Sequence, residues 1–129
     1  MNIKKEYTDL YKTAKEISEN AYAPYSNFKV GAAVLTKGGK VYSGVNIENS
    51  SYGATICAER SAVAAAVSDG SKDIEAIAVA SSGGAAWPCG ICRQVLYEFN
   101  EDMDIITGDD EKHLEVIKLR ELLVKGFKL

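Results

Sequence analysis

Three cysteines in two short stretches of the sequence have the spacing of metal ligands. Cys57 begins the stretch CAER, whereas Cys89 and Cys92 lie in PCGIC, and these are all the cysteines of the chain. A Cys-x-x-Cys pair places two thiols one helical turn apart, so a third thiol from another element would complete a three-ligand zinc site. Three protein ligands leave one position of a tetrahedral zinc ion open, which is typical of catalytic rather than structural zinc.

Two charged residues beside Cys57 suit such a centre. Glu59 follows the first cysteine by two residues, where a carboxyl group can move protons without binding the metal. Three thiolates and a hydroxide would leave the centre with excess negative charge, which weakens zinc as a Lewis acid. Two helix N-termini would each offset about half a charge. We expect Arg60 to add a full positive charge by donating a hydrogen bond to a thiolate.

Other interpretations of the cysteines remain open at this point. A structural zinc site with His113 as fourth ligand would use the same three thiols, and buried free thiols would need no metal at all. However, His113 lies in a charged turn, which favours an exposed side chain. A thioredoxin-like redox role for the Cys89-x-x-Cys92 pair would leave Cys57 and Glu59 unexplained.

The elements that must position these residues follow from the apolar pattern. The first helix is indicated by an apolar stripe at three- and four-residue spacing: Ile3, Tyr7, Leu10, Tyr11, Ala14, Ile17 and Ala21. We expect Pro24 to end this helix, and Tyr7 and Tyr11 to lie in the core. A β-hairpin follows, with strands from Phe28 to Thr36 and from Val41 to Ile47 around the Gly38-Gly39 turn.

Both cysteine stretches are predicted to lie where a strand or loop leads into a helix. Thr55 is a candidate N-cap for a helix that Gly70 stops. The nearly continuous apolar run from Ile74 to Ala80 predicts a central strand covered on both faces. A second helix begins at Pro88 and continues to Asn100. The two halves of the site should therefore open on one edge of a sheet.

The remaining segments complete a single domain over residues 1–129. Strands are predicted from Met103 to Thr107 and from His113 to Ile117, with a last helical turn from Leu119 to Val124. The order α-β-β-α-β-α-β-β-α indicates an α/β fold, a three-layer α/β/α sandwich around a five-stranded mixed sheet.

Composition narrows the classes of function. The chain has 129 residues, of which 47% are hydrophobic and 26% charged, which is ordinary for a globular protein. Nowhere do 18 apolar residues run together, so we expect no membrane span. The first lysines precede no apolar stretch, so we expect no signal peptide either, and we expect the protein to be cytoplasmic. A net charge of -3 without a basic run argues against binding nucleic acid.

Four sequence blocks in matching order resemble the cytidine deaminases, specifically their short, homotetrameric, three-cysteine type. Besides CAE and PCxxC, the blocks are APYSNFKVGAA from Ala23 to Ala33 and VNIEN from Val45 to Asn49, and the resemblance runs from about Ala21 onward. It implies that Cys57, Cys89 and Cys92 bind Zn²⁺. The cytidine deaminase fold that it implies agrees with the three-layer sandwich predicted from the pattern of elements.

The resemblance also implies a reaction. In zinc deaminases a glutamate that is not a ligand acts as general acid and base. Glu59 would take a proton from the attacking water, pass it to the pyrimidine ring and help the amine leave as ammonia. Cytidine and 2'-deoxycytidine would thus become uridine and 2'-deoxyuridine, a step of pyrimidine salvage. A pocket that excludes water should raise the pKa of this carboxyl group, which a group that acts first as a base and then as an acid requires.

The same resemblance implies how a nucleoside would be bound. Asn46 and Glu48 would hold the ribose hydroxyls, Ala58 would contact the ring through its backbone, and Phe28 would pack against the nucleoside. Phe127 matches an aromatic residue that closes over the pyrimidine from another subunit, which implies a homotetramer with active sites at subunit interfaces.

The resemblance also covers Tyr52 and Gln94, which we expect to support the site without taking part in the reaction. Without the resemblance, Asn46 and Glu48 would be solvated strand-end residues, and Phe127 would pack within its own chain.

Two rival functions remain. A blasticidin S-type deaminase, which acts on a nucleoside antibiotic, would share the zinc ligands and Glu59 but hold the sugar differently. A zinc-stabilised binding module without catalysis, or an enzyme acting on polynucleotide cytosines, belongs to another class. The acidic charge balance and a pocket closed by Phe127 argue against a polynucleotide.

Overall fold

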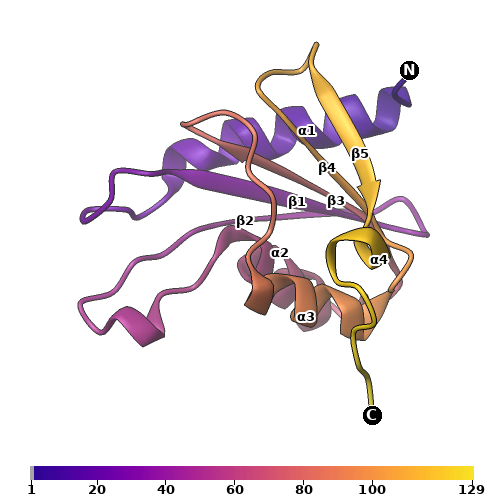
Figure 1. Ribbon diagram of the computed structural model, residues 1–129. Coiled ribbons are helices and arrows are strands. Elements are labelled where there is room, and N and C mark those ends of the chain that lie inside the picture. Colours follow the sequence, from indigo (N-terminus) through magenta and orange to yellow (C-terminus); the bar gives the residue numbers. More distant parts are fainter. Residues whose placement is uncertain (1) are drawn as a thin grey trace.

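A five-stranded sheet separates one long helix from two shorter ones in the computed structural model, which describes residues 2–129. Figure 1 shows α1 on one face of the sheet and both α2 and α3 on the other. The strands are β1 (Val30–Thr36), β2 (Val41–Val45), β3 (Ile74–Ser81), β4 (Asp104–Gly108) and β5 (Leu114–Lys118). The helices are α1 (Lys5–Ile17), η1 (Ser18–Asn20), η2 (Tyr52–Ala54), α2 (Ala58–Ser68), α3 (Gly90–Phe99) and α4 (Leu119–Leu122).

The sheet is mixed, with the strand order β2-β1-β3-β4-β5. Strand β1 pairs antiparallel with both β2 and β3, β3 pairs parallel with β4, and β4 pairs antiparallel with β5. Because β2 and β3 both run opposite to β1, they run in the same direction. Their carboxyl ends therefore reach the same edge of the sheet, and the predicted five-stranded α/β sandwich is confirmed.

Two apolar clusters hold the layers together, one on each face of the sheet. Val34, Val79 and Ile105 lie in the cluster under α2 and α3, whereas Ala33 and Ala78 lie in the cluster under α1. Successive strand residues thus contribute to opposite clusters, as pleated strands covered on both faces require.

Helix α1 packs on the sheet through Tyr7, Leu10, Tyr11 and Ala14, so the predicted core positions of both tyrosines are confirmed. Their hydroxyl groups still find acceptors: Tyr7 donates to Asp104 Oδ2 at 2.6 Å and Tyr11 to the Gly108 carbonyl at 3.2 Å. These bonds tie α1 to β4.

The ends of several elements differ from the sequence predictions. The first helix ends at Ile17 rather than near Pro24, because the chain tightens into η1 and Ala21 then turns to an extended conformation. Strand β2 ends at Val45 rather than Ile47, since Ile47 leaves β1 and bridges to Tyr22 and Ile56. The ends of β1, β3, β4, β5 and α4 differ from prediction by one or two residues.

The starts of α2 and α3 differ in a way that bears on the site. Thr55 is not the N-cap predicted for it, and the second helix does not begin at Pro88. Instead Cys57 and Cys89 are the N-caps, with extended backbone angles, and their carbonyls accept the first helical bonds from Ser61 and Arg93. Both cysteines thus lie at the positive end of a helix dipole.

No helix among residues 2–129 combines the length and the apolar character that crossing a bilayer would take.

Helix α2 lies very close to β2, and a glycine makes this possible. A Cβ atom added to Gly44 would stand 2.4 Å from the Ala62 nitrogen and 2.6 Å from Ser61 Cβ. The distance from β2 to α2 therefore depends on this missing side chain, and so does the place of the Cys57 end of the helix.

We predict that Gly44→Ala lowers the free energy of unfolding by about 1 to 3 kcal/mol, the usual effect of overpacking. Urea unfolding at fixed protein concentration would measure it. Gly38→Ala is the matched control, because the nearest atom to its added Cβ would be 3.9 Å away. Equal stability losses in both variants would contradict the close approach.

Candidate active site

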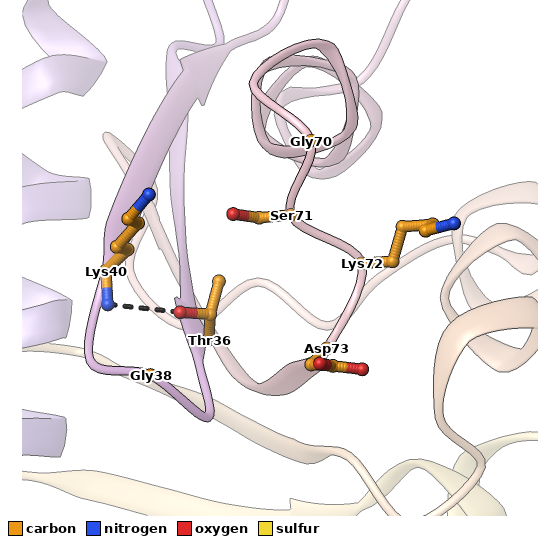
Figure 2. A pocket seen from close by; sticks show the side chains of 7 residues that line it. All are labelled: Thr36, Gly38, Lys40, Gly70, Ser71, Lys72 and Asp73. Carbon is orange, nitrogen blue, oxygen red and sulfur yellow. Dashed lines mark hydrogen bonds between the residues drawn. The ribbon is translucent and has the colours of Figure 1, made fainter.

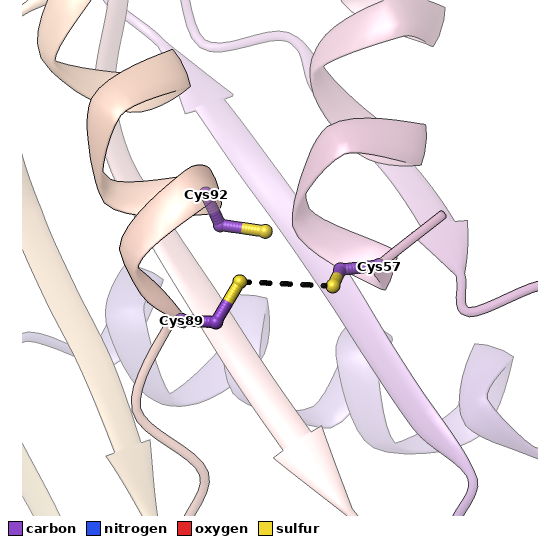
Figure 3. A group of neighbouring side chains, drawn as sticks. All are labelled: Cys57, Cys89 and Cys92. Carbon is purple, nitrogen blue, oxygen red and sulfur yellow. Dashed lines mark hydrogen bonds between the residues drawn. The ribbon is translucent and has the colours of Figure 1, made fainter. Parts of the chain in front are cut away.

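The three cysteines come together at the edge where β2 and β3 end. Their sulfur atoms all lie within 4.8 Å of one another, and Cys57 Sγ is 3.9 Å from Cys89 Sγ. Figure 3 shows Cys57 at the start of α2 and both Cys89 and Cys92 in the first turn of α3, with the sulfurs turned toward a common point. Cys57 thus forms one thiol cluster with a pair of cysteines that begins 32 positions later in the sequence.

The cluster distributes negative charge unequally. A hydrogen bond from the Cys92 thiol, together with bonds from Arg60 and Cys89, lowers the pKa of Cys57 to about 5. The same bond and burial raise the pKa of the Cys92 thiol. Arg60 Nη2 lies 3.7 Å from Cys57 Sγ and also donates to the Thr55 carbonyl at 3.4 Å. Of the three thiols, Cys57 is the one whose surroundings most favour the thiolate that a zinc ion binds.

The donor set and its surroundings fit a zinc ion. Sulfurs at the usual 2.3 Å from a tetrahedral zinc stand about 3.8 Å apart, close to the separation of Cys57 and Cys89. Within residues 2–129, the buried Nε of Arg60 has no hydrogen-bond partner, so a guanidinium charge is held against the sulfurs at the cost of one unpaired donor. Together with two helix N-termini, this charge suits an anionic metal-thiolate centre.

His113 lies apart from the thiols. Its Nδ1 is 2.8 Å from Asp110 Oδ1 in the exposed turn between β4 and β5, and the described metal-ligand cluster contains only the three cysteines. The structure therefore does not support His113 as a fourth ligand.

Glu59 is buried next to this cluster. Its side chain is only 5% exposed, and burial, with the added negative charge of Cys57, raises the pKa of its carboxyl group to about 7. A carboxyl group with such a pKa exchanges protons readily near neutral pH, as a general acid and base must. The adjacent Ala58 is fully buried at the first position of α2.

A cavity of about 210 Å³ opens beside the cluster. Cys57, Cys89 and Glu59 lie on its wall, and Phe28, Asn46, Ala58 and Trp87 are among its other lining residues. Titratable groups thus share a concave space with two aromatic side chains, as in many small-molecule sites. Sequence reasoning missed Trp87, because a lone tryptophan before Pro88 gives no spacing signal.

The two residues assigned to the sugar lie in different surroundings. Asn46 is buried, where its Oδ1 accepts from the Val30 nitrogen at 2.9 Å and its Nδ2 donates to the Phe28 carbonyl at 2.8 Å. Asn46 thereby fixes the start of β1 and the backbone of Phe28. Contrary to the prediction, Asn46 and Glu48 do not lie within the end of a strand, because β2 stops at Val45.

Glu48 lines a shallower depression that shares Thr55 with the cavity. Its carboxylate accepts hydrogen bonds from the backbone nitrogens of Tyr25 and Ser26 and from the Ser26 hydroxyl. The Ser26 hydroxyl is the largest of the causes that lower the pKa of Glu48. The group is therefore an ionised acceptor at neutral pH. Tyr52, on the rim of the same depression, is 82% exposed.

Phe127 does not reach the cavity of its own chain. Its side chain is 68% exposed, although Gln94 Nε2 donates to its carbonyl at 3.2 Å and so holds the backbone against α3. Simple packing of this aromatic ring within its own chain is thus not what the structure shows.

A second concavity, of about 220 Å³, lies at the hairpin end of β1 and β2 (Figure 2). There the Lys40 nitrogen donates to Thr36 Oγ1 at 3.0 Å, and Ser71 and Asp69 bond to Tyr42. It contains none of the thiols and lies at the opposite edge of the sheet from them. The cysteine cavity is therefore the candidate active site.

Comparison with known proteins points to the same cluster. The family model for the cytidine and deoxycytidylate deaminase zinc-binding region matches residues 4–108. A curated cytidine deaminase from Halalkalibacterium halodurans is 47% identical over 120 residues, which cover 92% of this chain and 91% of that protein. A blasticidin-S deaminase from Bacillus cereus is a more distant relative, 32% identical over 114 residues, 81% of each chain.

Solved structures share the fold. The crystal structure of cytidine deaminase from Burkholderia pseudomallei has a TM-score of 0.86 and 42% sequence identity, and the match covers 92% of this chain and 97% of that one.

Because the chain has only three cysteines, thiol titration reports on this cluster alone. We predict that protein loaded with zinc reacts slowly with a disulfide reagent, and that chelation exposes three fast-reacting thiols. Metal analysis should give one zinc per chain, and Cys89→Ser should lower zinc affinity at least 10-fold, since loss of a ligand exceeds the effect of losing a supporting contact. Equal thiol reactivity with and without chelator would contradict a shared metal site.

Proposed function

This chain belongs to the cytidine and deoxycytidylate deaminase family, and we propose that it hydrolyses cytidine and 2'-deoxycytidine to uridine and 2'-deoxyuridine, releasing ammonia in pyrimidine salvage. The observation that carries the proposal is a buried carboxyl group, Glu59, on the wall of the cavity that also holds Cys57 and Cys89. A reduced thiol cluster of this kind supports a place in the cytoplasm, where thiols stay reduced.

Cys57, Cys89 and Cys92 would hold the zinc ion. When bound, zinc would act as a Lewis acid that makes water a nucleophile near neutral pH. Arg60 would offset the negative charge of the thiolates through its contact with Cys57 Sγ. Its removal should make the ligands more basic and the metal a weaker Lewis acid.

Glu59 would transfer the protons of the reaction. Its carboxylate would take a proton from the attacking water, deliver it to N3 of the pyrimidine as C4 is attacked, and then protonate the departing amine. Water thus supplies the oxygen of uridine. One of its protons stays on N3 of the product, and the other, taken from the new hydroxyl group on C4, leaves with ammonia. The raised pKa of Glu59 supports both halves of this role.

The nucleoside would lie between Phe28 and the cluster. The ionised Glu48 would accept hydrogen bonds from the ribose hydroxyls, and the amide of Asn46 could donate or accept one there. The backbone at Ala58 would contact the ring. The hydrogen bond from Asn46 to the Phe28 carbonyl supports this arrangement, because it couples a sugar-binding side chain to the aromatic wall. A sugar bound in this way would favour plain ribose or deoxyribose.

A homotetramer would complete the site. The exposed ring of Phe127 would close over the pyrimidine of a neighbouring subunit, and Gln94 would support it by holding the Phe127 backbone. Exposed apolar side chains on the segments next to Phe28 and Asn46 in sequence, namely Tyr22, Tyr25 and Ile47, support burial of these segments against other copies of the chain.

A blasticidin S-type deaminase is the alternative. It would share the thiols and Glu59, and the lower identity to the blasticidin-S deaminase favours the cytidine reading. Comparing turnover of cytidine and of the antibiotic would decide between them.

We predict that the zinc-loaded protein lowers the ultraviolet absorbance of cytidine with release of ammonia. Glu59→Gln should keep its zinc but lose about 10² to 10⁴-fold in kcat, because it removes the proton-transfer group. The control is Glu98→Gln, the same chemical change on the exposed side of α3. Zinc binding without reaction of either nucleoside would leave the metal site intact and refute the assigned substrate.

Mixing two impaired variants would test the role of Phe127 across subunits. Phe127→Ala should lower kcat/KM for cytidine about 10-fold, the equivalent of about 1.4 kcal/mol of lost aromatic contact. When its subunits are exchanged with those of Glu59→Gln, hybrid assemblies contain sites with both an intact Glu59 and an intact Phe127 from the neighbour. Activity should then exceed the sum of the separate variants. Strict additivity would assign Phe127 to its own chain.

A further inference from the structure

Arg93 holds the backbone on both sides of Cys89. Its backbone nitrogen donates to the Cys89 carbonyl at 2.9 Å, which is the first hydrogen bond of α3. Its side-chain Nε donates to the Pro88 carbonyl at 2.6 Å. Because Pro88 precedes the N-cap, its carbonyl lies outside the helical ladder and Arg93 supplies its partner. One residue thus fixes the peptide groups before and after a metal-ligand candidate.

The same guanidinium reaches a second segment of the chain. Arg93 Nη1 donates to the Leu122 carbonyl at 2.8 Å. Leu122 is the last residue of α4, where carbonyl groups lack helical partners and arginine side chains often supply them. The guanidinium group of Arg93 therefore bonds to both the Pro88 and the Leu122 carbonyl. These two residues are 34 positions apart in sequence and lie in different segments of the fold.

Other residues of α3 hold the segment that follows Leu122. Gln94 donates to the Phe127 carbonyl, and a Cβ atom added to Gly126 would stand 3.0 Å from the ring of Tyr97. Residues 122–127 thus lie along the helix whose first turn carries Cys89 and Cys92. Figure 1 shows this segment leaving α4 beside α3.

We propose that Arg93 is a positioning residue that sets Cys89 and the segment 122–127 in one fixed relation, so that zinc retention and the placement of Phe127 depend on the same side chain. The effect on substrate rests on the proposed function, whereas the effect on zinc rests only on the thiol site. Lysine cannot replace this arginine, because a single ammonium group lacks the planar fork that reaches two carbonyls at once.

The test compares Arg93→Lys with Arg120→Lys, the same chemical change on α4, where Arg120 pairs with Asp102 and Glu101 at the surface. The first measurement is the rate of zinc transfer from the holoprotein to a coloured chelator. Arg93→Lys should release zinc about 10- to 100-fold faster than wild type, as for other residues that support a metal ligand. Arg120→Lys should release zinc at the wild-type rate.

The second measurement separates the two effects assigned to Arg93, on zinc retention and on the placement of Phe127. Gln94→Ala removes only the contact to the Phe127 carbonyl, so it should raise KM for cytidine while zinc release stays at the wild-type rate. Arg93→Lys should change both. Equal zinc release in Arg93→Lys and wild type would overturn the proposal, and so would faster release in Gln94→Ala to the same degree.

General loss of stability is controlled by Leu10→Ala, which removes a buried side chain of α1 on the face of the sheet opposite α2 and α3. If this variant, at a matched melting temperature, released zinc as fast as Arg93→Lys, Arg93 would have no positioning role. The deaminase proposal has a separate outcome, because it fails when zinc-loaded wild-type protein does not convert either nucleoside.

Discussion

The antiparallel pairing of β1 with both β2 and β3 is the constraint on which the site depends. It forces β2 and β3 to run in the same direction, so the segments that follow them emerge at one edge of the sheet. Helix α2 follows β2 and helix α3 follows β3, and each begins with a cysteine as its N-cap. A different direction for either strand would separate Cys57 from Cys89 by the length of the sheet.

The balance of charge at this edge of the sheet is a second constraint. Three thiols and a carboxyl group gather there, and Cys92 and Glu59 are buried. Negative charge on such a group is unfavourable unless positive charge is near. Two helix N-termini and Arg60 supply it, and Arg60 leaves a buried donor unpaired in doing so. The opposite pKa shifts of Cys57 and Cys92 follow from the same crowding, since one sulfur keeps a proton that stabilises the charge of the other.

Local patterns in the sequence predicted much of this arrangement. Apolar periodicity predicted the five strands and the layers, and cysteine spacing predicted which thiols would meet. Patterns failed where tertiary contacts decide the outcome. Thr55 has the side chain of an N-cap, yet the extended bridge at Ile47 and Ile56 moves the helix start to Ala58. The contacts of Arg93 with Pro88 and Leu122 join segments far apart in sequence, so no local pattern predicts them.

The Gly38-Gly39 turn lies at the far end of β2 from the thiols. A five-residue strand spans about 17 Å, so the turn and the cavity are separated by that length of sheet. Gly39 has a φ of 89° and an added Cβ there would meet nothing within 4 Å. Within one chain this turn is therefore a natural attachment point, because a fluorophore, an affinity tag or a tether to a solid support inserted there would lie at the opposite end of the sheet from the thiols.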